Sequence, residues 1–564
     1  MRRLFGRAAN VWPRLLAAAG CALIMNGCAG LPKDVQRPES HALASTEGTA
    51  LSALVQARRA QAGNAASGFA LLDGPHAAYG SRLALAEAAQ KTLDLQYYAI
   101  HADASTARLL RAVRDAAGRG VRVRILLDDF HSVGRNALVL QLAYVPNIEM
   151  RLFNPLAGGR QSTARRVMSS LGDVQRIQQR MHNKLFIADN ALGITGGRNL
   201  GDAYFGLGDA GNFVDLDVLA AGPVVRDMSR SFDSYWNNER AYPAQSLVTP
   251  EELAAIRESE RSKSNSARAD GAPTPPDGEP RPASGEADPQ ERARRLARAW
   301  DQKPMDLKAL AFVWAPSTML ADAPGKIPAD AKAAAGPQPD RPPPARGELP
   351  EGDTVVDGML HLIGEARRDL LIISPYFVPG EDMKKAFADA RQRGVRIRVL
   401  TNSLASNDAP IAHVGYARHR MELLDAGVEL YEMRSEQAGL GSALGTSGAS
   451  ATGESRAMLH SKVLVRDDRL LVVGSMNLDL RSQLQNTEIA LLIRSRELSR
   501  QATALIERSL KEGAWRVERE NGGALVWRAP AGSGLKDART EPDSSLGLRL
   551  LLRVIGPLAP DEML

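Results

Sequence analysis

The sequence predicts an α/β protein whose main sheet is covered by helices. The segment 93–100 reads as a strand, and 121–127 is apolar and β-branched with Arg122 and Arg124 interleaved, the pattern of a strand in a sheet covered by helices. Between them, 106–117 places its apolar residues on one helical face. Strands that alternate with amphipathic helices indicate a sheet flanked by helices.

A second copy of this series follows in the same chain. The segments 369–379 and 394–403 repeat the two strands, and Gly394 follows Gly120 at an offset of 274 residues. Val428 follows Ile148 at 280 and His460 follows His182 at 278, and offsets this steady indicate two homologous halves rather than coincidence.

Length and composition limit the possible classes. At 564 residues the chain exceeds the roughly 100–200 residues of one ordinary domain. Hydrophobic residues make up 44% and charged residues 24%, close to the average of water-soluble globular proteins, and nothing in the composition indicates a polytopic membrane protein. The net charge of +6, from 71 basic and 65 acidic residues, fits an anionic substrate without requiring one.

The N-terminus resembles a lipoprotein export signal. Arginines precede an apolar run at 15–25, whose eleven residues fall short of the roughly 20 that span a bilayer. Cleavage before Cys28 would leave a thiol for lipidation, and Cys21 is a second candidate. We expect an exported protein, anchored by an N-terminal lipid and facing the periplasm or cell exterior; an uncleaved signal anchor would also place it outside the cytoplasm. Both cysteines lie in this leader, so the body has no disulfide.

Composition divides the chain into six parts. We expect a signal at 1–28, a polar tether at 29–64, a first domain at 65–250, a linker with a disordered insert near 258–290 at 251–350, a second domain at 351–530, and a C-terminal segment at 531–564. The linker is rich in Pro, Ser, Ala and charge, and cannot bury much surface.

Three shorter segments within these parts carry their own expectations. We expect a short helix at 292–300. The Gly/Ser/Ala-rich stretch 439–453 reads as a loop that either covers a groove or is tolerated surface. The apolar segment 546–555 contains two arginines and is interpreted as a core helix or strand, with a position at a membrane interface as the alternative.

One spacing of polar residues occurs twice, at an offset of 278. The pattern H-x-K, then D, then G-[GS]-x-N is formed by His182, Lys184, Asp189, Gly196, Gly197 and Asn199 in the first half and by His460, Lys462, Asp467, Gly474, Ser475 and Asn477 in the second. A lone histidine on a strand is usually structural. Duplication at the repeat offset reverses that expectation.

The residue types of this pattern suit phosphoryl chemistry. Residues i and i+2 of a strand face the same side, so His and Lys of each H-x-K address one point. The paired small residues leave room for a phosphate near the backbone, and each Asn can donate to a phosphoryl oxygen. Two lysines stabilise the negative charge of the transition state.

Two histidines permit a division of labour that needs no metal and no cofactor. A neutral one attacks phosphorus, and a protonated one donates to the leaving alkoxide. Each needs an acceptor for its far ring nitrogen, and Asp215 and Glu488 are the best candidates, with Asp217 as the alternative to Asp215. For Asp189 and Asp467 we expect structural hydrogen bonds or ion pairs.

At these residues the chain resembles the phospholipase D superfamily, whose signature is the H-x-K-x4-D-x6-G-[GS]-x-N motif present twice. The strings LDLQYYAIHAD, GVRVRILLDD, RLFNP, RMHNK, GGRNLGDAYF and DLDVLAAGPVV look like the bacterial cardiolipin synthase C branch, from about residue 65 to the end. The resemblance implies two α/β/α halves, each a mixed sheet flanked by helices, packed face to face around one active site without metal. It also implies phosphatidyl transfer through a covalent phosphohistidine, with His182 as nucleophile and His460 as acid/base.

The expected partners are phospholipids and a membrane surface. Phosphatidylglycerol is the expected substrate and phosphatidylethanolamine a possible second one, while a partner subunit is not predictable from the sequence. A phospholipase D that uses water as acceptor needs the same residues. A phosphodiester nuclease is disfavoured, because the net charge is small and no basic stripe is interleaved with aromatics, so no nucleic acid is expected. The chain departs from the family at Gly197, where many members have Ser, and in the insert near 258–290.

Overall fold

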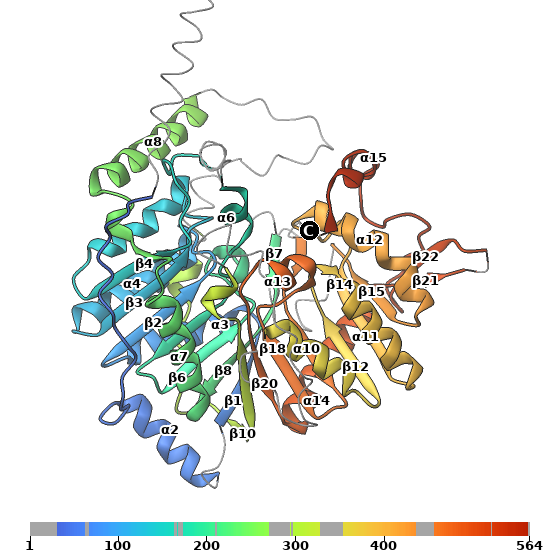
Figure 1. Ribbon diagram of the computed structural model, residues 1–564, viewed down its shortest axis with the longest axis horizontal. Coiled ribbons are helices and arrows are strands. Elements are labelled where there is room, and N and C mark those ends of the chain that lie inside the picture. The colour runs from blue at the N-terminus through green and yellow to red at the C-terminus, as the bar shows by residue number, and fades with distance from the viewer. Residues whose placement is uncertain are drawn as a thin grey trace, which may run out of the picture.

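The computed structural model describes residues 31–62, 67–162, 166, 173–208, 211–269, 294, 297–327, 354–435, 456–520 and 522–561. Figure 1 shows two α/β bodies side by side, the N-terminal one blue to green and the C-terminal one yellow to red. The leader with Cys21 and Cys28, the 439–453 stretch and the insert beyond residue 269 lie outside the described residues.

The first half contains a long mixed sheet with helices on both faces. The strands of this half are β1 (Ser67–Asp73), β2 (Thr92–Tyr97), β3 (Arg122–Asp128), β4 (Ile148–Phe153), β5 (Leu185–Ala188), β6 (Leu192–Gly196), β7 (Gly211–Val214), β8 (Leu216–Ala221) and β9 (Ala241–Pro243). Its α-helices are α2 (Ala50–Gln61), α3 (Pro75–Ala88), α4 (Ala104–Gly118), α6 (Val174–Gln178), α7 (Pro223–Trp236) and α8 (Pro250–Ala269), and the longest 3₁₀ segment is η1 (Gly134–Tyr144).

The second half has the same plan. After β10 (Val313–Ala315), its strands are β11 (Ser317–Ala321), β12 (Asp369–Ile373), β13 (Phe377–Val378), β14 (Arg396–Asn402), β15 (Glu429–Met433), β16 (Arg456–Leu459), β17 (Val463–Arg466), β18 (Leu470–Gly474), β19 (Leu478–Asp479), β20 (Ile489–Ile493), β21 (Ala514–Arg519) and β22 (Leu525–Arg528). Its helices are α10 (Val355–Gly364), α11 (Glu381–Gln392), α12 (Pro410–Asp425), α13 (Leu480–Leu484), α14 (Arg496–Glu512) and α15 (Leu546–Ile555).

The strand orders show that the halves are copies of one another. The first sheet runs β10-β1-β8-β6-β5-β2-β3-β4-β9 and the second β11-β20-β18-β17-β12-β14-β15-β21-β22. In both, three neighbouring strands are parallel, β2-β3-β4 and β12-β14-β15, and the strands beside them are antiparallel. The predicted fold class, two mixed sheets flanked by helices, is therefore confirmed.

The arginines of the predicted strand 121–127 are compatible with burial because they are paired. Arg124 is fully buried in β3, and its guanidinium donates to both carboxylate oxygens of Asp94 at 2.7 and 2.8 Å. The same group lies 4.7 Å from the ring centre of Phe232 on α7. A buried charge is tolerated where it is both paired and hydrogen-bonded.

The two halves share one hydrophobic core and pair through their backbones. Leu185 and Val218 of the first half belong to the same buried cluster as Val463 and Leu491 of the second. Strands β7 and β16, which come from different halves, pair in parallel over four residues. The face-to-face arrangement is thus a packed interface in which the halves cannot move independently without exposing core.

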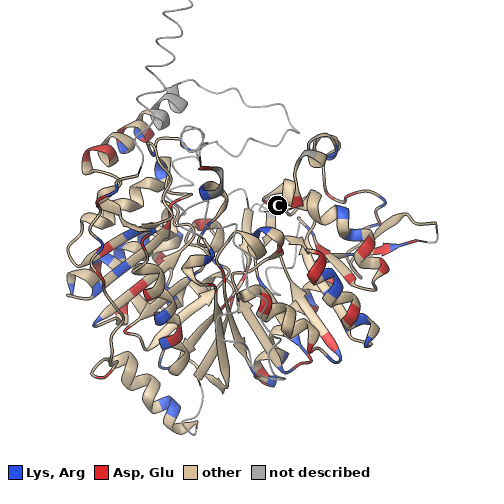
Figure 2. Cartoon of the chain, in the orientation of Figure 1, with Lys and Arg blue, Asp and Glu red and all other residues tan. Residues whose placement is uncertain are grey.

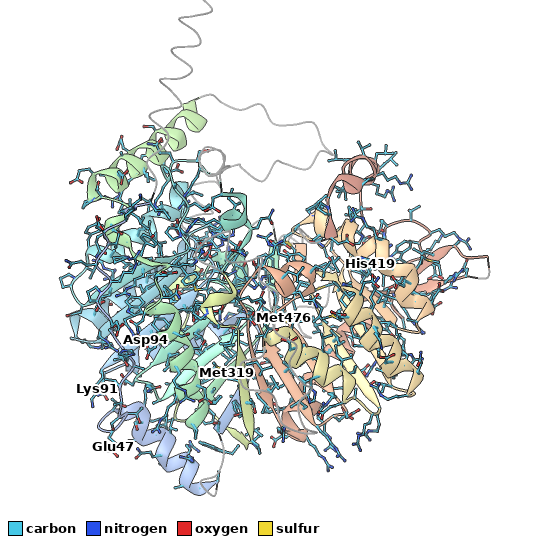
Figure 3. All side chains as sticks on the ribbon, viewed as in Figure 1. Glu47, Lys91, Asp94, Met319, His419 and Met476 are labelled. Carbon is cyan, nitrogen blue, oxygen red and sulfur yellow. The ribbon has the colours of Figure 1, made fainter. Side chains whose placement is uncertain are left out.

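The expected polar tether at 29–64 is wrong for its described part. Helix α2 begins after the N-cap Thr49 and buries Leu51 and Val55 against the first half. Before it, the Lys91 ammonium donates to the carbonyl of Glu47 at 2.7 Å (Figure 3). Such contacts to backbone carbonyls leave no periodic apolar signal, which explains why sequence patterning missed this segment.

The expected linker at 251–350 also contains ordered elements. Residues 250–269, where the insert begins, form α8, and a helix covers 297–301 as expected from the sequence. Strand β10 pairs with β1 of the first sheet, while β11, one residue further on, pairs with β20 of the second. The crossing between halves is therefore a pair of consecutive edge strands.

The C-terminal segment is anchored on the second half. Glu541 bonds His413 and Arg420, and Asp561 bonds Arg418 and His419, all four partners lying on α12. Residues 546–555 form a helix, but the expectation of a core position is wrong, because four of its large apolar side chains are exposed. Across the described residues, no helix combines the length and apolarity needed to cross a bilayer.

Candidate active site

Both motif histidines open into one cavity between the halves. The cavity has a volume of about 790 Å³ and is lined by His182 and Asn199 from the first half and by His460 and Asn477 from the second. Each histidine lies at the entrance of a strand, because His182 precedes β5 and His460 connects β16 to β17. The two copies of the motif therefore contribute to one site.

Each histidine is oriented by a carboxylate of the other half. The Nδ1 atom of His182 lies 2.9 and 3.1 Å from the Glu488 oxygens, and that of His460 lies 2.8 Å from Asp215 Oδ2. Since a carboxylate only accepts, Nδ1 carries the proton in both rings. The Nε2 lone pairs are thereby left for chemistry.

Backbone hydrogen bonds hold this crossed pairing in place. The His182 amide donates to the carbonyl of Thr487 at 2.9 Å, and the Thr487 amide donates back to Arg180 at 3.0 Å. On the other side, the His460 amide donates to Val214 at 2.9 Å. Each histidine therefore forms a main-chain bond to the residue directly before the acid that orients it.

Asp217, the alternative orienting acid, has a different role. Its carboxylate pairs with the buried guanidiniums of Arg82 at 2.9 Å and Arg198 at 3.4 Å. It therefore neutralises two arginines behind the site, and Asp215 is the acid that contacts a motif histidine.

The motif lysines are buried and bonded to the backbone of their own motif. Lys184 donates to the carbonyl of His182, and Lys462 to that of His460, each at 2.5 Å. Burial lowers the pKa of Lys184 to about 7 and also lowers that of Lys462. Each ammonium thus holds its histidine's backbone and adds positive charge beside the ring.

The two asparagines line the cavity with different partners. Asn199 donates to the hydroxyl of Tyr204 at 3.0 Å and accepts from the amide of Ala99 at 3.2 Å. The side-chain oxygen of Asn477 is buried without a hydrogen-bond partner. A buried polar atom without a partner is costly, which is typical of a site that awaits a ligand.

The small motif residues are needed for close packing of strands. A Cβ on Gly197 would lie 2.5 Å from both Asp215 oxygens, one on Gly196 2.1 Å from Asp217 Oδ1, and one on Gly474 2.2 Å from the Ile489 carbonyl. The sequence suggested room for a phosphate, but this space is filled by the strand that carries the orienting acids.

Ser475 is the counterpart of Gly197 and contributes a hydroxyl. Its Oγ donates to Glu488 Oε2 at 2.5 Å and accepts from the Ile489 amide at 3.0 Å. The first half has no such hydroxyl beside Asp215. The two orienting carboxylates therefore have different hydrogen-bond partners.

The motif aspartates have structural positions. Asp189 accepts from the amides of Gln90, Lys91 and Thr92, and Asp467 likewise accepts from three consecutive amides at 367–369. Both carboxylates thus hold the start of the first of the three parallel strands of their own sheet, β2 or β12, and neither lines the cavity.

The electrostatics make the two histidine–acid pairs unequal. Burial, with the charges of Lys184 and Lys462, lowers the pKa of His182 well below its usual range. Burial also lowers the pKa of His460, to about 4. For the acids, burial raises the pKa of Glu488 to about 7. For Asp215, burial is outweighed by the His460 hydrogen bond together with the charges of His460, Arg198 and Lys462, and the pKa is lowered.

Aromatic residues that the sequence reasoning missed also surround the histidines. The ring of Tyr98 meets that of His182 edge-on at 5.2 Å, and Tyr204 meets His460 at 5.3 Å. Tyr376, from the second half, also lines the cavity and donates to Asp408 at 2.8 Å. Tyr376 follows Tyr98 at an offset of 278, the offset of the two motifs, so a comparison of the repeats would have found this pair.

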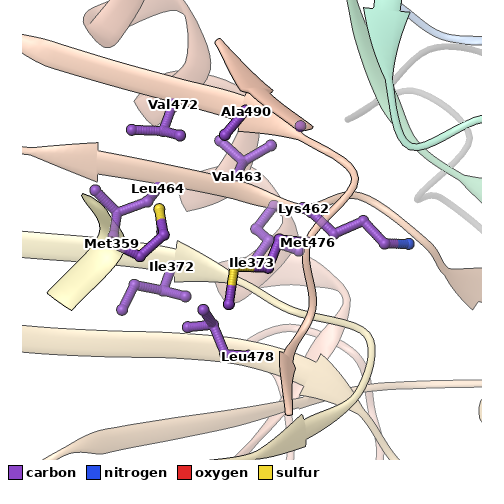
Figure 4. Close-up of a pocket in the computed structure, with 11 residues that line it drawn as sticks. Met359, Ile372, Ile373, Lys462, Val463, Leu464, Val472, Met476, Leu478 and Ala490 are labelled. Atoms are coloured by element: carbon purple, nitrogen blue, oxygen red, sulfur yellow. The ribbon is translucent and has the colours of Figure 1, made fainter. Parts of the chain in front are cut away.

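A second, much smaller cavity lies in the core of the second half and is not a site for chemistry. It holds about 20 Å³, enough for about one water, among apolar side chains such as Ile372 and Met476. The Lys462 stem borders it, but its ammonium points away (Figure 4). Within the described ranges, no group of three or more His, Cys, Asp or Glu side chains is arranged to hold a metal ion.

Comparison with known proteins agrees with this duplicated site. Residues 83–236 and 359–510 each match the family model described as cardiolipin synthase, PLD-like domain. The chain is 34% identical to cardiolipin synthase C of Escherichia coli over 498 residues, covering 86% of this chain and 94% of that protein. It is also 31% identical to an uncharacterized protein of Helicobacter pylori, covering 83% of this chain and 84% of that one.

A solved structure shows the same fold. The phosphatidylserine synthase of Haemophilus influenzae superimposes with a TM-score of 0.51 at 13% identity, covering 89% of this chain and 97% of that one. The family model extends over more than half of the chain, in two copies that coincide with the two halves. The chain therefore belongs to the cardiolipin synthase family of phospholipase D-like enzymes.

Proposed function

We propose that the protein is a phosphatidyltransferase of the cardiolipin synthase type, which transfers a phosphatidyl group between lipid alcohols through a covalent phosphohistidine. The observation that carries this proposal is the crossed pairing. Two buried imidazoles, each oriented by a carboxylate of the other half, present Nε2 to one cavity. Such an arrangement suits an in-line exchange at a single phosphorus atom.

In the first step, the Nε2 lone pair of His182 attacks phosphorus. A P–N bond forms and the bond from phosphorus to the leaving alkoxide breaks, while His460 gives its Nε2 proton to that alkoxide. The low pKa of His182 keeps this ring neutral at physiological pH, as a nucleophile must be. Lys184 and Lys462 supply positive charge where the phosphoryl oxygens gain negative charge.

In the second step, the acceptor hydroxyl replaces the leaving alcohol. It loses its proton to His460 Nε2, its oxygen bonds phosphorus, and the P–N bond to His182 breaks. His460 must therefore carry a proton at the start of the cycle, although its pKa in the empty site is about 4. A bound phosphodiester anion raises that pKa, because the nearby negative charge favours imidazolium.

The inequality of the two acids supports this assignment of roles. Asp215 has a lowered pKa and stays ionised, which stabilises the imidazolium that His460 must form. Glu488 has a pKa of about 7 and shares its charge with the Ser475 hydroxyl, so it pulls less strongly on the His182 proton. The weaker partner suits a ring whose task is to attack while neutral.

The donor and acceptor proposed are phospholipids, with phosphatidylglycerol as donor and a second phosphatidylglycerol or phosphatidylethanolamine as acceptor. Support comes from the similarity to a protein named cardiolipin synthase C. Hydrolysis to phosphatidic acid uses the same residues and differs only in admitting water as acceptor. A nuclease is disfavoured, because basic and acidic residues are interspersed over the described chain in the view of Figure 2.

Product identification tests the proposal. Purified protein is incubated with phosphatidylglycerol, alone and with phosphatidylethanolamine, and the lipids are separated. Cardiolipin is expected; phosphatidic acid alone would establish hydrolysis, and no product would refute both.

Histidine variants connect the product to the site. His182→Ala and His460→Ala should each abolish product, because the other two histidines that line the cavity, His101 and His131, are not paired with a carboxylate in the described structure. His361→Ala is the matched control, since His361 lies on α10 and pairs only with the surface residue Glu365. Near-normal turnover in either motif variant would refute the shared site.

The proposed location is outside the cytoplasm, with the body held at a membrane by lipid on Cys28. The support is the sequence of the leader, in which arginines precede the short apolar run 15–25.

A further inference from the structure

Helix α15 presents an apolar face that no described part of the chain covers. Across the described residues, eight large hydrophobic side chains are exposed, and four of them lie on this one helix of ten residues. They are Leu546, Leu550, Leu551 and Val554, with exposed fractions of 65%, 51%, 55% and 73%. Leu552 is buried, so the helix has a docked side and an apolar outer side.

The helix is held firmly against α12, which forms a wall of the active-site cavity. Arg418 on α12 donates to the carbonyls of Gly556 and Ala559 just after α15. A Cβ on Gly556 would lie 2.7 Å from a methyl of Val414, and Ala412, two residues earlier on α12, lines the cavity. Figure 1 shows α15 in red beside α12. The apolar face is therefore fixed near the catalytic cavity.

Another exposed apolar residue lies beside the cavity on a different element. Leu484, at the end of α13, is 57% exposed, while Arg481 on the same helix lines the cavity. Five of the eight exposed large hydrophobic side chains of the described residues therefore lie on α13, which helps to line the cavity, or on α15, which packs on a helix that lines it.

A phospholipid surface fits this face better than a second protein copy. One ten-residue helix is too small for a stable dimer, which needs roughly 800 Å² from each partner. Arg553 is exposed beside Val554 and Arg549 lies on the adjoining flank, so basic groups border the apolar residues. An apolar helix face with basic residues at its margin is the pattern of a helix that lies in the headgroup region of an anionic bilayer.

We propose that α15 docks the cavity onto an anionic phospholipid bilayer, with Leu546, Leu550 and Val554 inserted among the acyl chains and Arg553 among the headgroups. Docking at this place brings the cavity to the surface where its substrates lie. This inference rests on the proposed function for its purpose, but the docking itself is measurable without turnover.

A fluorescent label tests the docking directly in the full chain. The chain has only two cysteines, so Cys21→Ser with Cys28→Ser frees it for a single label at Leu550→Cys. We expect the emission of an environment-sensitive dye to shift to the blue with phosphatidylcholine vesicles that contain phosphatidylglycerol, and less with phosphatidylcholine alone.

A second label site provides the control. Leu535 is 40% exposed in the loop after the edge strand β22, so Leu535→Cys should report little change. Equal responses at the two sites, or none at Leu550, would overturn the proposal. A shift that appears on raising the protein concentration without vesicles would show contact with a second copy and would also overturn it.

Turnover on two forms of one lipid separates docking from catalysis. Leu550→Glu should lower turnover of phosphatidylglycerol in vesicles by about tenfold or more, because a charge replaces an inserted leucine. It should spare a short-chain phosphatidylglycerol that is dissolved as monomers, and Leu535→Glu should spare both forms. Equal effects of Leu550→Glu on both forms, or none on vesicles, would refute the proposal. If the unaltered protein turns over neither form, the proposed function fails while the label still decides the docking.

Discussion

The crossed histidine–acid pairs predict that a carboxylate in one half controls chemistry assigned to the other. Glu488→Gln keeps the shape of the side chain but removes the charge that His182 Nδ1 meets at 2.9 Å. A hydrogen bond to a charged group contributes about 1.5–3 kcal/mol. With about 1.36 kcal/mol for each factor of ten, attack on phosphorus should slow by about 10- to 150-fold. Asp215→Asn removes the charge that orients His460, so the proton transfers assigned to His460 should slow by a similar factor.

The leaving group distinguishes the two variants. A phosphatidyl ester of p-nitrophenol needs no proton for its leaving group, so its release in a rapid-mixing experiment reports attack alone. Glu488→Gln should slow this burst, because the nucleophile is affected. Asp215→Asn should spare the burst but slow the following transfer to an alcohol, so the covalent intermediate should accumulate and be recovered on His182.

Asp467→Asn is the matched control. It replaces a buried motif carboxylate that only accepts backbone amides, and it should leave the burst unchanged. A burst that survives Glu488→Gln but is lost in Asp215→Asn would reverse the assigned roles. Bursts slowed equally in both variants would refute the division of labour.

Three further predictions concern the same site and its location. The pH profile of kcat/KM should be bell-shaped around neutrality. Below pH 7 Glu488, whose pKa is raised to about 7, becomes protonated and stops accepting from His182, and above pH 7 Lys184, whose pKa is lowered to about 7, loses its charge. A flat profile across the neutral range would contradict this prediction. Gly197→Ala should lower the free energy of unfolding by about 1–3 kcal/mol and also slow turnover, since the new Cβ would displace the Asp215 carboxylate; thermal denaturation and product formation measure the two effects, and unchanged turnover would show that the close contact is dispensable. Cys28→Ser should abolish labelling by fatty acid and release the protein from isolated membranes, and continued labelling would redirect attention to the other leader cysteine.

Much of the fold was predictable because it depends on local periodicity repeated twice. The strands 93–100 and 121–127 and the helix between them appear where the apolar pattern placed them. Segments that fold by other means were missed. The region before residue 65 is held by two buried apolar side chains of α2 and by a bond to a backbone carbonyl, and β10 and β11 are short edge strands in a Pro-rich linker. Helix α15 is apolar yet exposed, so hydrophobicity alone misplaced it in the core.

By itself, the sequence determined which reactive groups the protein has. The H-x-K pair and the Asn that follows it occur twice, 278 residues apart, and an acid follows each motif. Only the tertiary structure decided which acid serves which histidine, because the partners are separated by 306 and 245 residues and their pairing depends on how two sheets pack. It also decided that Gly197 makes room for a carboxylate and that Asp217 binds arginines. Spacing along a chain fixes which side chains share a strand, whereas contact between strands depends on packing that no local pattern records.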